Sequence, residues 1–274
     1  MSYNSGDIVG YKNKLEEFRA YIFDLKGKVL IAHHGDCDGM VGGGLLAAFI
    51  NQNLPAVTQV TYASSAEFRK QDFDYFSQFT EDCDFGIFVE GQGMTQDYGV
   101  LNEKFINIDH HPHPEDTPIK RMLNPRNFAI QPNPAISYVM YELFSEHLPP
   151  EASWIAALGS IVDYCPLPAE KIIAAHTKEL EEADALRDTF LACQYVLPLT
   201  CQLAEFIATM PTPQALLAAE PYASRRVIYQ NKIKEAISGA AISQDTVVAK
   251  TTVGEYRISS PWPIDYRTFT MIAA

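Results

Sequence analysis

Short apolar segments alternate with helical patterns in the first half of this chain, and this alternation restricts the possible folds more than any other feature. The apolar segments cover residues 29–32, 57–62, 85–89 and 105–108, and residues 40–52 show a helical pattern between the first two. Strands separated by helical segments favour a parallel sheet with both faces covered. The sequence therefore predicts an α/β fold with a parallel sheet and flanking helices.

The second half of the chain is predominantly helical. Residues 135–147 and 151–162 carry apolar residues at three-to-four spacing, which is typical of helices with one buried face. Pro166 and Pro168 then interrupt the pattern, and residues 170–208 continue it.

A second proline-containing break, at residues 210–213, indicates a domain boundary. Beyond it, residues 246–250 and 255–259 predict two strands of a smaller unit. The final residues, 269–274, have a helical pattern without a capping glycine, which predicts a chain cut within a helix. We therefore expect a catalytic domain over residues 1–165, a helical connector over 166–210, and a partial C-terminal α/β substrate-binding domain over 211–274.

The composition restricts the partners of such a protein. The chain carries 21 basic and 34 acidic residues, a net charge of −13. This balance argues against a long nucleic-acid duplex as a partner of the bulk surface, because phosphate binding needs clustered lysine and arginine. A short anionic substrate remains compatible, since bound cations reverse the local field.

Five cysteines, none of them in a Cys-x-x-Cys pair, predict free thiols in a reducing compartment. The N-terminus lacks the basic start and apolar run of a signal peptide. No apolar stretch reaches the roughly 20 residues of a membrane span. We therefore expect a soluble, cytoplasmic protein.

Three of the predicted strands are followed directly by aspartate, glutamate or histidine residues, which are types that can bind metal ions. In a parallel sheet, the carboxyl ends of such strands meet at one edge. The strand ends supply His34, Asp36 and Asp38 after the first, Glu90 after the third, and Asp109, His110 and His111 after the fourth. Asp163 follows an apolar helical run and is a further candidate.

These residue types indicate a particular chemistry. Oxygen and imidazole ligands without thiolate favour Mn²⁺, Mg²⁺ or a similar cation. Two such ions about 3.5–4 Å apart stabilise both oxygens of an in-line displacement at phosphorus. The sequence offers six ligands for two ions: His34, Asp36, Asp38, Glu90, His110 and Asp163.

Simpler interpretations of single motifs remain open. A calcium loop starting at His34 has Leu45 where a bidentate glutamate is needed, which argues against it. Glu90 alone is also compatible with a solvated loop acid, and Asp163 with a helix cap. The glycines at positions 42–44 favour close helix packing and a phosphate contact about equally.

The motifs His34-x-Asp36-x-Asp38-Gly39, Asp109-His110-His111 and the later Asp163 together resemble the DHH phosphoesterase family in order and spacing. The resemblance covers about residues 28–165, and Asn124-Pro125 and residues 134–137 resemble its RecJ-like branch. That family includes RecJ-like exonucleases, nanoRNases, cyclic-dinucleotide phosphodiesterases and exopolyphosphatases.

The resemblance implies a role for each matched residue. His34 and Asp36 would hold a first metal ion, and Asp38, His110 and Asp163 a second, with Glu90 in the position of the family's bridging aspartate. His111 would contact the scissile phosphate or protonate the leaving oxygen, and Asp109 would orient His110. Arg126 is our candidate for a phosphate clamp, because a guanidinium group fits phosphate bidentately.

Two departures from the family pattern stand out. Glu90 replaces the usual aspartate, and its additional methylene moves the carboxylate oxygens. No segment after Met210 matches the glycine-rich, histidine-containing motif of the family's substrate-binding domain, although residues 258–263 are a candidate for its opening.

The function we expect is Mn²⁺- or Mg²⁺-dependent hydrolysis of phosphodiester bonds in short single-stranded oligonucleotides. The alternative among enzymes is an exopolyphosphatase that uses the same site. The alternative from another class is a catalytically inactive binding or scaffold protein with the DHH fold.

Overall fold

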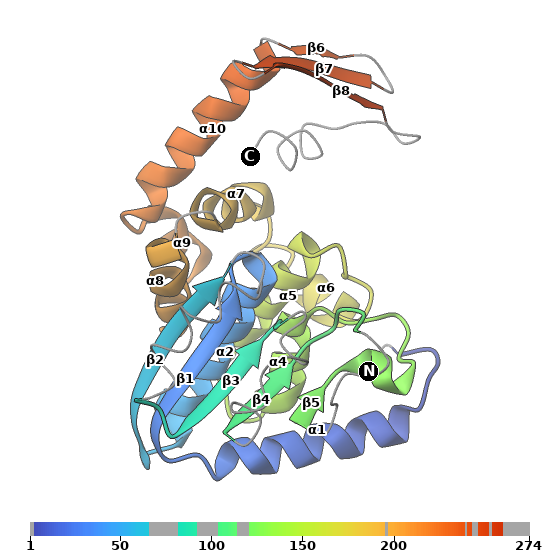
Figure 1. Ribbon diagram of the computed structural model, residues 1–274, viewed down its shortest axis with the longest axis vertical. Helices are drawn as coiled ribbons and strands as arrows, with labels where there is room; N and C mark the ends of the chain where they lie inside the picture. The colour runs from blue at the N-terminus through green and yellow to red at the C-terminus, as the bar shows by residue number, and fades with distance from the viewer. Residues whose placement is uncertain are drawn as a thin grey trace.

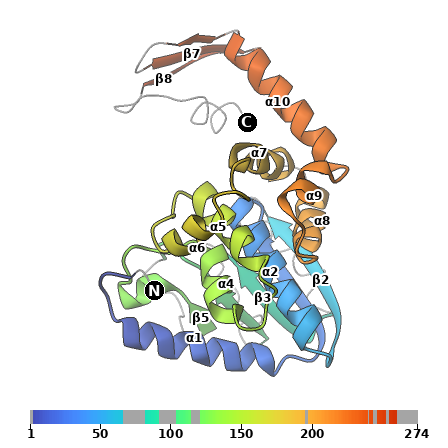
Figure 2. The same cartoon turned by 180° about the vertical axis from the view of Figure 1, so that it is seen from behind.

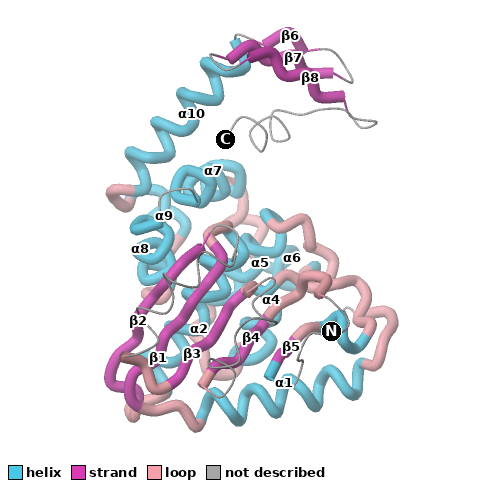
Figure 3. The backbone as a smooth tube through the Cα atoms, in the orientation of Figure 1, coloured by secondary structure: helices cyan, strands magenta, loops and turns pink. Residues whose placement is uncertain are grey.

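A computed structural model describes residues 3–65, 82–91, 104–113, 121–194, 197–238, 240–242, 246–251 and 254–259. Its main body is built on a five-stranded sheet in the order β2-β1-β3-β4-β5 (Figure 1 and Figure 3), and every paired strand is parallel to its neighbour. The strands are β1 (Gly27–His34), β2 (Val57–Ser65), β3 (Phe85–Val89), β4 (Phe105–Ile108) and β5 (Met122–Leu123). The predicted parallel α/β fold is confirmed.

The strand order reverses direction at β1, because β2 pairs on one side of it and β3 on the other. Ligands in open parallel sheets bind at such a reversal, beyond the carboxyl ends of the strands. His33 of β1 lies in register with Val89 of β3. The residues that follow, His34 and Glu90, therefore emerge side by side at this position.

Helix α2 (Cys37–Asn53) is the centre of the core. Its residues from Cys37 to Ile50 are all buried, which suits a helix that is apolar on every side. Figure 2 shows α4 (Ile136–Phe144) and α5 (Ala152–Val162) beside α2, on the face of the sheet that is turned toward the viewer. The helix begins three residues earlier than the predicted start at residue 40, so Asp38 lies in its first turn.

Helix α1 (Ile8–Phe23) was not predicted. Asp7 caps its start by accepting a hydrogen bond from the backbone of Gly10, and its buried face consists of Tyr11, Leu15, Phe18 and Ile22. It runs along the edge of the body below β5 (Figure 1) and packs against α4.

The predicted helical pattern over residues 170–208 forms three helices rather than one: α6 (Glu170–Ala175), α7 (Ala183–Gln194) and α8 (Leu197–Ile207). After the proline break come α9 (Pro213–Ala218) and α10 (Tyr222–Ser238). Helix α10 packs on α7 and leads away from the body (Figure 1).

A three-stranded antiparallel sheet follows α10, with β6 (Ala240–Ile242), β7 (Thr246–Thr251) and β8 (Gly254–Ser259). Its last two strands confirm the two that the sequence predicts. Residues 260–274, which include the predicted cut helix and most of the candidate 258–263 segment, lie outside the described residues. The domain boundaries remain a prediction.

All five cysteines are free thiols, as the sequence predicts. Within the described ranges, none of the helices combines the length and the apolar character that crossing a membrane requires.

The contact between α2 and α8 yields a test of the fold. A Cβ added to Gly44 would lie 2.4 Å from Cγ2 of Ile207 and 2.9 Å from the carbonyl oxygen of Ala204. Gly44→Ala should therefore lower the free energy of unfolding by about 1–3 kcal/mol, even though alanine favours a helix by about 1 kcal/mol. Denaturant unfolding measures the change. Asn51→Ala, at an exposed position of the same helix, is the control and should not destabilise the protein. An unfolding free energy for Gly44→Ala equal to the wild-type value would contradict the packing.

Candidate metal centre

The first part of the site forms where β1 ends and α2 begins. His34 is the last residue of β1, and Asp36 is the N-cap of α2, whose Oδ1 accepts a hydrogen bond from the backbone of Gly39 at 2.9 Å. This cap turns the other oxygen of Asp36 toward His34, so that Oδ2 lies 2.8 Å from Nδ1. The strand-to-helix turn therefore pairs the first two predicted ligands.

Gly39 permits this turn to close. A Cβ at this position would lie 2.5 Å from the carbonyl oxygen of His34 and 2.9 Å from Oε2 of Glu90. Real side chains do not approach backbone oxygen so closely, so only glycine lets α2 start this near to the other strand end.

Glu90 occupies the centre of the site. It follows β3 directly and its side chain is 1% exposed. Oε2 faces Nδ1 of His34 at 3.7 Å, while Oε1 faces Nε2 of His110 at 3.5 Å. Its two oxygens thus point to two different groups of ligands, which excludes the interpretation of Glu90 as a solvated loop acid.

The backbone of Glu90 is unusual as well. Its φ of 62° lies in the left-handed region, which residues other than glycine rarely adopt. Conformations of this kind persist where the surrounding structure enforces them, and they concentrate at functional sites.

The second group of ligands surrounds Nε2 of His110. This atom lies 3.9 Å from Oδ2 of Asp38 and 3.7 Å from Oδ2 of Asp163. Asp163 is the C-cap of α5, which carries it from the far side of the core to the sheet edge. Candidate ligand atoms of Asp38, Glu90, His110 and Asp163 all lie within 4.8 Å of one another, as do those of His34, Asp36 and Glu90. The structure therefore brings all six predicted ligands together, with Glu90 in both groups.

The start of α4 fixes two of these ligands at once. The backbone amides of Ile136 and Ser137 donate to the two oxygens of Asp38 at 2.6 and 2.8 Å. The carbonyl oxygen of Pro134 lies 2.9 Å from Nδ1 of His110, which leaves Nε2 to face the cluster. The sequence pattern at residues 134–137 resembled the RecJ-like branch, but it did not reveal this positioning role.

Asp109 orients a different ring from the one expected. Its Oδ1 lies 3.0 Å from Nδ1 of His111, and it also accepts hydrogen bonds from the backbone amides of His110 and His111. The expectation that Asp109 orients the His110 ring is therefore wrong, because Pro134 holds that ring instead.

Arg126 lies on the same edge of the sheet, within a short 3₁₀ helix, η2 (Pro125–Phe128). Its Nε donates to the carbonyl oxygen of His110 at 2.6 Å, which anchors the side chain beside the cluster. Asn124, which the sequence did not single out for this role, donates to the carbonyl oxygen of His111 at 2.9 Å and accepts from the backbone of Arg126 at 2.9 Å.

Neighbouring charges set the proton affinities of the two buried imidazoles. Burial disfavours the protonated form of His34, but the Asp36 and Glu90 carboxylates outweigh it and raise the pKa to about 11. Burial also opposes protonation of His110, and the Cys165 thiol and Glu90 beside it raise its pKa to about 12.

The carboxylates respond to burial and to one another. Burial, followed by the negative charge of Asp36, raises the pKa of Glu90 to about 7. Burial and the nearby Asp38 raise the pKa of Asp163 to about 8. The cluster thus concentrates more negative charge than the protein alone stabilises.

These residues fit divalent cations. Both oxygens of Glu90, Nε2 of His110 and Oδ2 of Asp163 are buried without a hydrogen-bond partner in the described part of the chain. Buried polar atoms normally have such partners. Converging carboxylate and imidazole atoms of this kind match the ligands of Mn²⁺ and similar ions.

The remaining candidates lie elsewhere. Gly42, Gly43 and Gly44 are buried and pack against Ile136, His33 and Ile207 respectively, which favours the helix-packing interpretation of the glycines.

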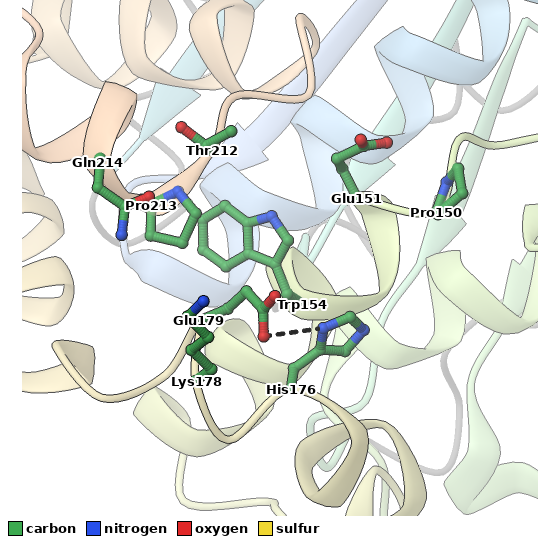
Figure 4. A pocket seen from close by; sticks show the side chains of 9 residues that line it. All are labelled: Pro150, Glu151, Trp154, His176, Lys178, Glu179, Thr212, Pro213 and Gln214. Carbon is green, nitrogen blue, oxygen red and sulfur yellow. Dashed lines mark ion pairs between the residues drawn. The ribbon is translucent and has the colours of Figure 1, made fainter.

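Figure 4 shows a separate pocket near the start of α5, where His176 pairs with Glu179 at 3.4 Å beside Trp154. Its volume is about 540 Å³. None of the six predicted ligands lines it.

No protein-family model matches the sequence, and no curated protein matches it. Several solved structures are similar. RecJ from Thermus thermophilus in complex with Mn²⁺ has a TM-score of 0.59 at 15% identity, covering 83% of this chain and 39% of that chain. An exonuclease RecJ bound to manganese has a TM-score of 0.54 at 15% identity, covering 83% of this chain and 70% of that one.

A third similar structure is the DHH domain of a protein described as a member of a family of ribosomal proteins, with a TM-score of 0.61 at 14% identity. It covers 94% of this chain and 69% of that chain. At these identities the similarity establishes the fold alone: the chain has the fold of a DHH domain. It spans less than half the length of the Thermus RecJ.

The raised pKa values predict that metal affinity increases with pH. Near neutral pH, protons occupy His34 and His110, with pKa values of about 11 and about 12, and they partly occupy Glu90 and Asp163, at about 7 and about 8. A cation must displace these protons, so its affinity should rise about tenfold per pH unit for each proton released. The rise should be steepest below about pH 7, where Glu90 and Asp163 also release protons, and should continue above about pH 8 because the histidines remain protonated there. Calorimetry in buffers of different ionisation enthalpy measures both the affinity for the cation and the number of protons released on binding. An affinity for Mn²⁺ that does not change with pH would contradict the assignment of these ligands.

Proposed function

We propose that this protein is a metal-dependent phosphodiesterase that hydrolyses short single-stranded oligonucleotides. The observation that carries the proposal is the placement of Glu90, whose two carboxylate oxygens face two separate groups of metal-binding side chains. A shared carboxylate between two cation positions suits a two-metal site, which stabilises the attacking and leaving oxygens of an in-line displacement at phosphorus.

The structural neighbours support this choice of reaction. Two of them are RecJ structures that contain manganese, and one is named an exonuclease. We therefore favour Mn²⁺ as the native cation, with Mg²⁺ as the substitute.

The ligands divide into two sets that share Glu90. His34 and Asp36 would hold the first ion, and Asp38, His110 and Asp163 the second. When bound, the ions polarise the phosphoryl group and make water a stronger nucleophile at neutral pH.

His111 is suited to protonate the leaving oxygen. Asp109 accepts at Nδ1, so this nitrogen carries a proton and the ring is held in one orientation. Burial opposes protonation of His111, but the hydrogen bond and charge of Asp109 raise its pKa. The side chain is 28% exposed, with Nε2 at 3.8 Å from Oε1 of Glu90, so it borders both the cluster and solvent.

Arg126 is suited to hold a substrate phosphate. Its Nε is occupied by the carbonyl oxygen of His110, and the rest of the exposed guanidinium group remains to donate. The net charge of −13 disfavours long polyanions, so a single local arginine beside metal ions suits a short substrate.

The activity is tested with a substrate panel: a dinucleotide, a longer single strand, a cyclic dinucleotide and polyphosphate, each with Mn²⁺ and with chelator. Asp163→Asn is the informative variant, because Oδ2 of Asp163 has no hydrogen-bond partner within the described ranges. Removing the charge of this side chain should therefore not destabilise the fold. Asp38 is less suitable, since its carboxylate also holds the start of α4.

We expect mononucleotide release from the short strands that needs metal and falls by about 10²-fold or more in Asp163→Asn. Glu181→Gln, an exposed acid outside the site, should retain full activity. If polyphosphate were the one substrate turned over, with release of orthophosphate, the protein would be an exopolyphosphatase instead. Absence of turnover on every substrate would overturn the enzyme proposal in favour of a binding or scaffold protein.

The role of His111 predicts a dependence on the leaving group. His111→Ala should reduce kcat on an ordinary dinucleotide by about 10²- to 10⁴-fold, and much less on a nitrophenyl ester of a nucleotide, whose leaving oxygen needs no proton. His113→Ala is the matched control, since its ring bonds to Asn127 and His113 belongs to none of the metal-binding groups found among the described residues. Equal losses on both substrates would contradict proton donation by His111.

A further inference from the structure

The end of α5 reverses the chain in a way that returns it to the metal centre. The backbone amide of Cys165 donates to the carbonyl oxygen of Ser160 at 2.9 Å, and that of Tyr164 donates to Ile161 at 3.2 Å. This pair of bonds is a Schellman motif, which needs a left-handed residue at the position of Tyr164. Tyr164 has a φ of 58°, although glycine usually fills this position.

The reversal brings a thiol into the second group of ligands. Candidate ligand atoms of His110, Asp163 and Cys165 all lie within 4.8 Å of one another. Nε2 of His110 and Oδ2 of Asp163 are buried, neither makes a hydrogen bond of normal geometry where the structure is described, and the His110 side chain is 6% exposed. These unpartnered atoms point to a ligand beside Cys165.

Proximity in sequence does not explain this placement. Cys37 lies between two predicted ligands, yet it is buried in the hydrophobic core and belongs to none of the metal-binding groups found among the described residues. Cys165 was counted in the sequence only as a free thiol, and the fold makes it a neighbour of His110.

We propose that Cys165 supplies a sulfur donor to the second cation position, which makes that position a nitrogen, oxygen and sulfur site for thiophilic divalent cations such as Zn²⁺ and Cd²⁺. This inference rests on the metal centre of the proposed function and adds a specificity residue to it. On binding, the thiol releases its proton to solvent and a sulfur electron pair bonds to the cation, with no change of oxidation state.

The two cation positions then differ in chemistry. The first position, with His34, Asp36 and Glu90, contains only nitrogen and oxygen donors. The second adds sulfur, which favours softer cations than Mn²⁺ or Mg²⁺. Cys165 therefore gives the centre one position that soft cations prefer over the other.

The test is a titration of the full metal-free chain with Cd²⁺. Binding is monitored through the ultraviolet charge-transfer absorption that cadmium thiolates show. We expect one absorbing site per chain in the wild type and in Cys201→Ser, which removes a thiol outside the cluster. Cys165→Ser should lose the absorption. In the wild type, Cd²⁺ should also protect Cys165 from alkylation, as read by mass spectrometry, which needs no variant.

The outcomes separate this inference from the proposed function. If calorimetry shows cation binding but no thiolate absorption appears, or if Cys165→Ser keeps the absorption, the sulfur donor is overturned while the metal centre stands. If the wild type binds neither Cd²⁺ nor Mn²⁺, both the sulfur donor and the proposed function fail.

Discussion

The rest of the site depends on the buried carboxylate of Glu90, which lies between the His34 and His110 rings. It is buried, each of its oxygens faces a different histidine, and neither oxygen has a hydrogen-bond partner in the described chain. A carboxylate in this situation is costly unless cations compensate it. The reversal of strand order at β1 places Glu90 beside His34, and Gly39 lets α2 start close enough to complete the first group of ligands.

The helices that form the core also set the ligand geometry. The start of α4 binds the carboxylate of Asp38 and holds the ring of His110, while the end of α5 delivers Asp163. Both helices pack on α2, whose first turn contains Asp38. Packing of these three helices and coordination of a cation are therefore coupled, and a defect in the core is expected to reach the site through Asp38 and His110.

The sequence predicted the parallel sheet and the meeting of the predicted ligands that follow its strands, because strand ends in such a sheet converge whatever the intervening helices do. Asp163 follows a helix instead, and its place in the site was expected from the family resemblance. It did not predict features that depend on side-chain direction or on local turns. His110 and His111 both follow Asp109 within two residues, so their order in the sequence does not show which ring Asp109 holds. The Pro134 carbonyl binds the His110 ring, which leaves Asp109 to bind the His111 ring. The approach of Cys165 depends on a left-handed tyrosine that no residue pattern signals. Strand β5 is too short for a periodic signal.

The central claim is that Glu90 lies between two cation positions, and anomalous X-ray diffraction at the manganese edge tests it most directly. Crystals of the full chain grown with Mn²⁺ should show two anomalous peaks, one on each side of the Glu90 carboxylate, the first near His34 and Asp36 and the second near His110 and Asp163. A single peak, or peaks that do not contact Glu90, would contradict the shared-carboxylate centre.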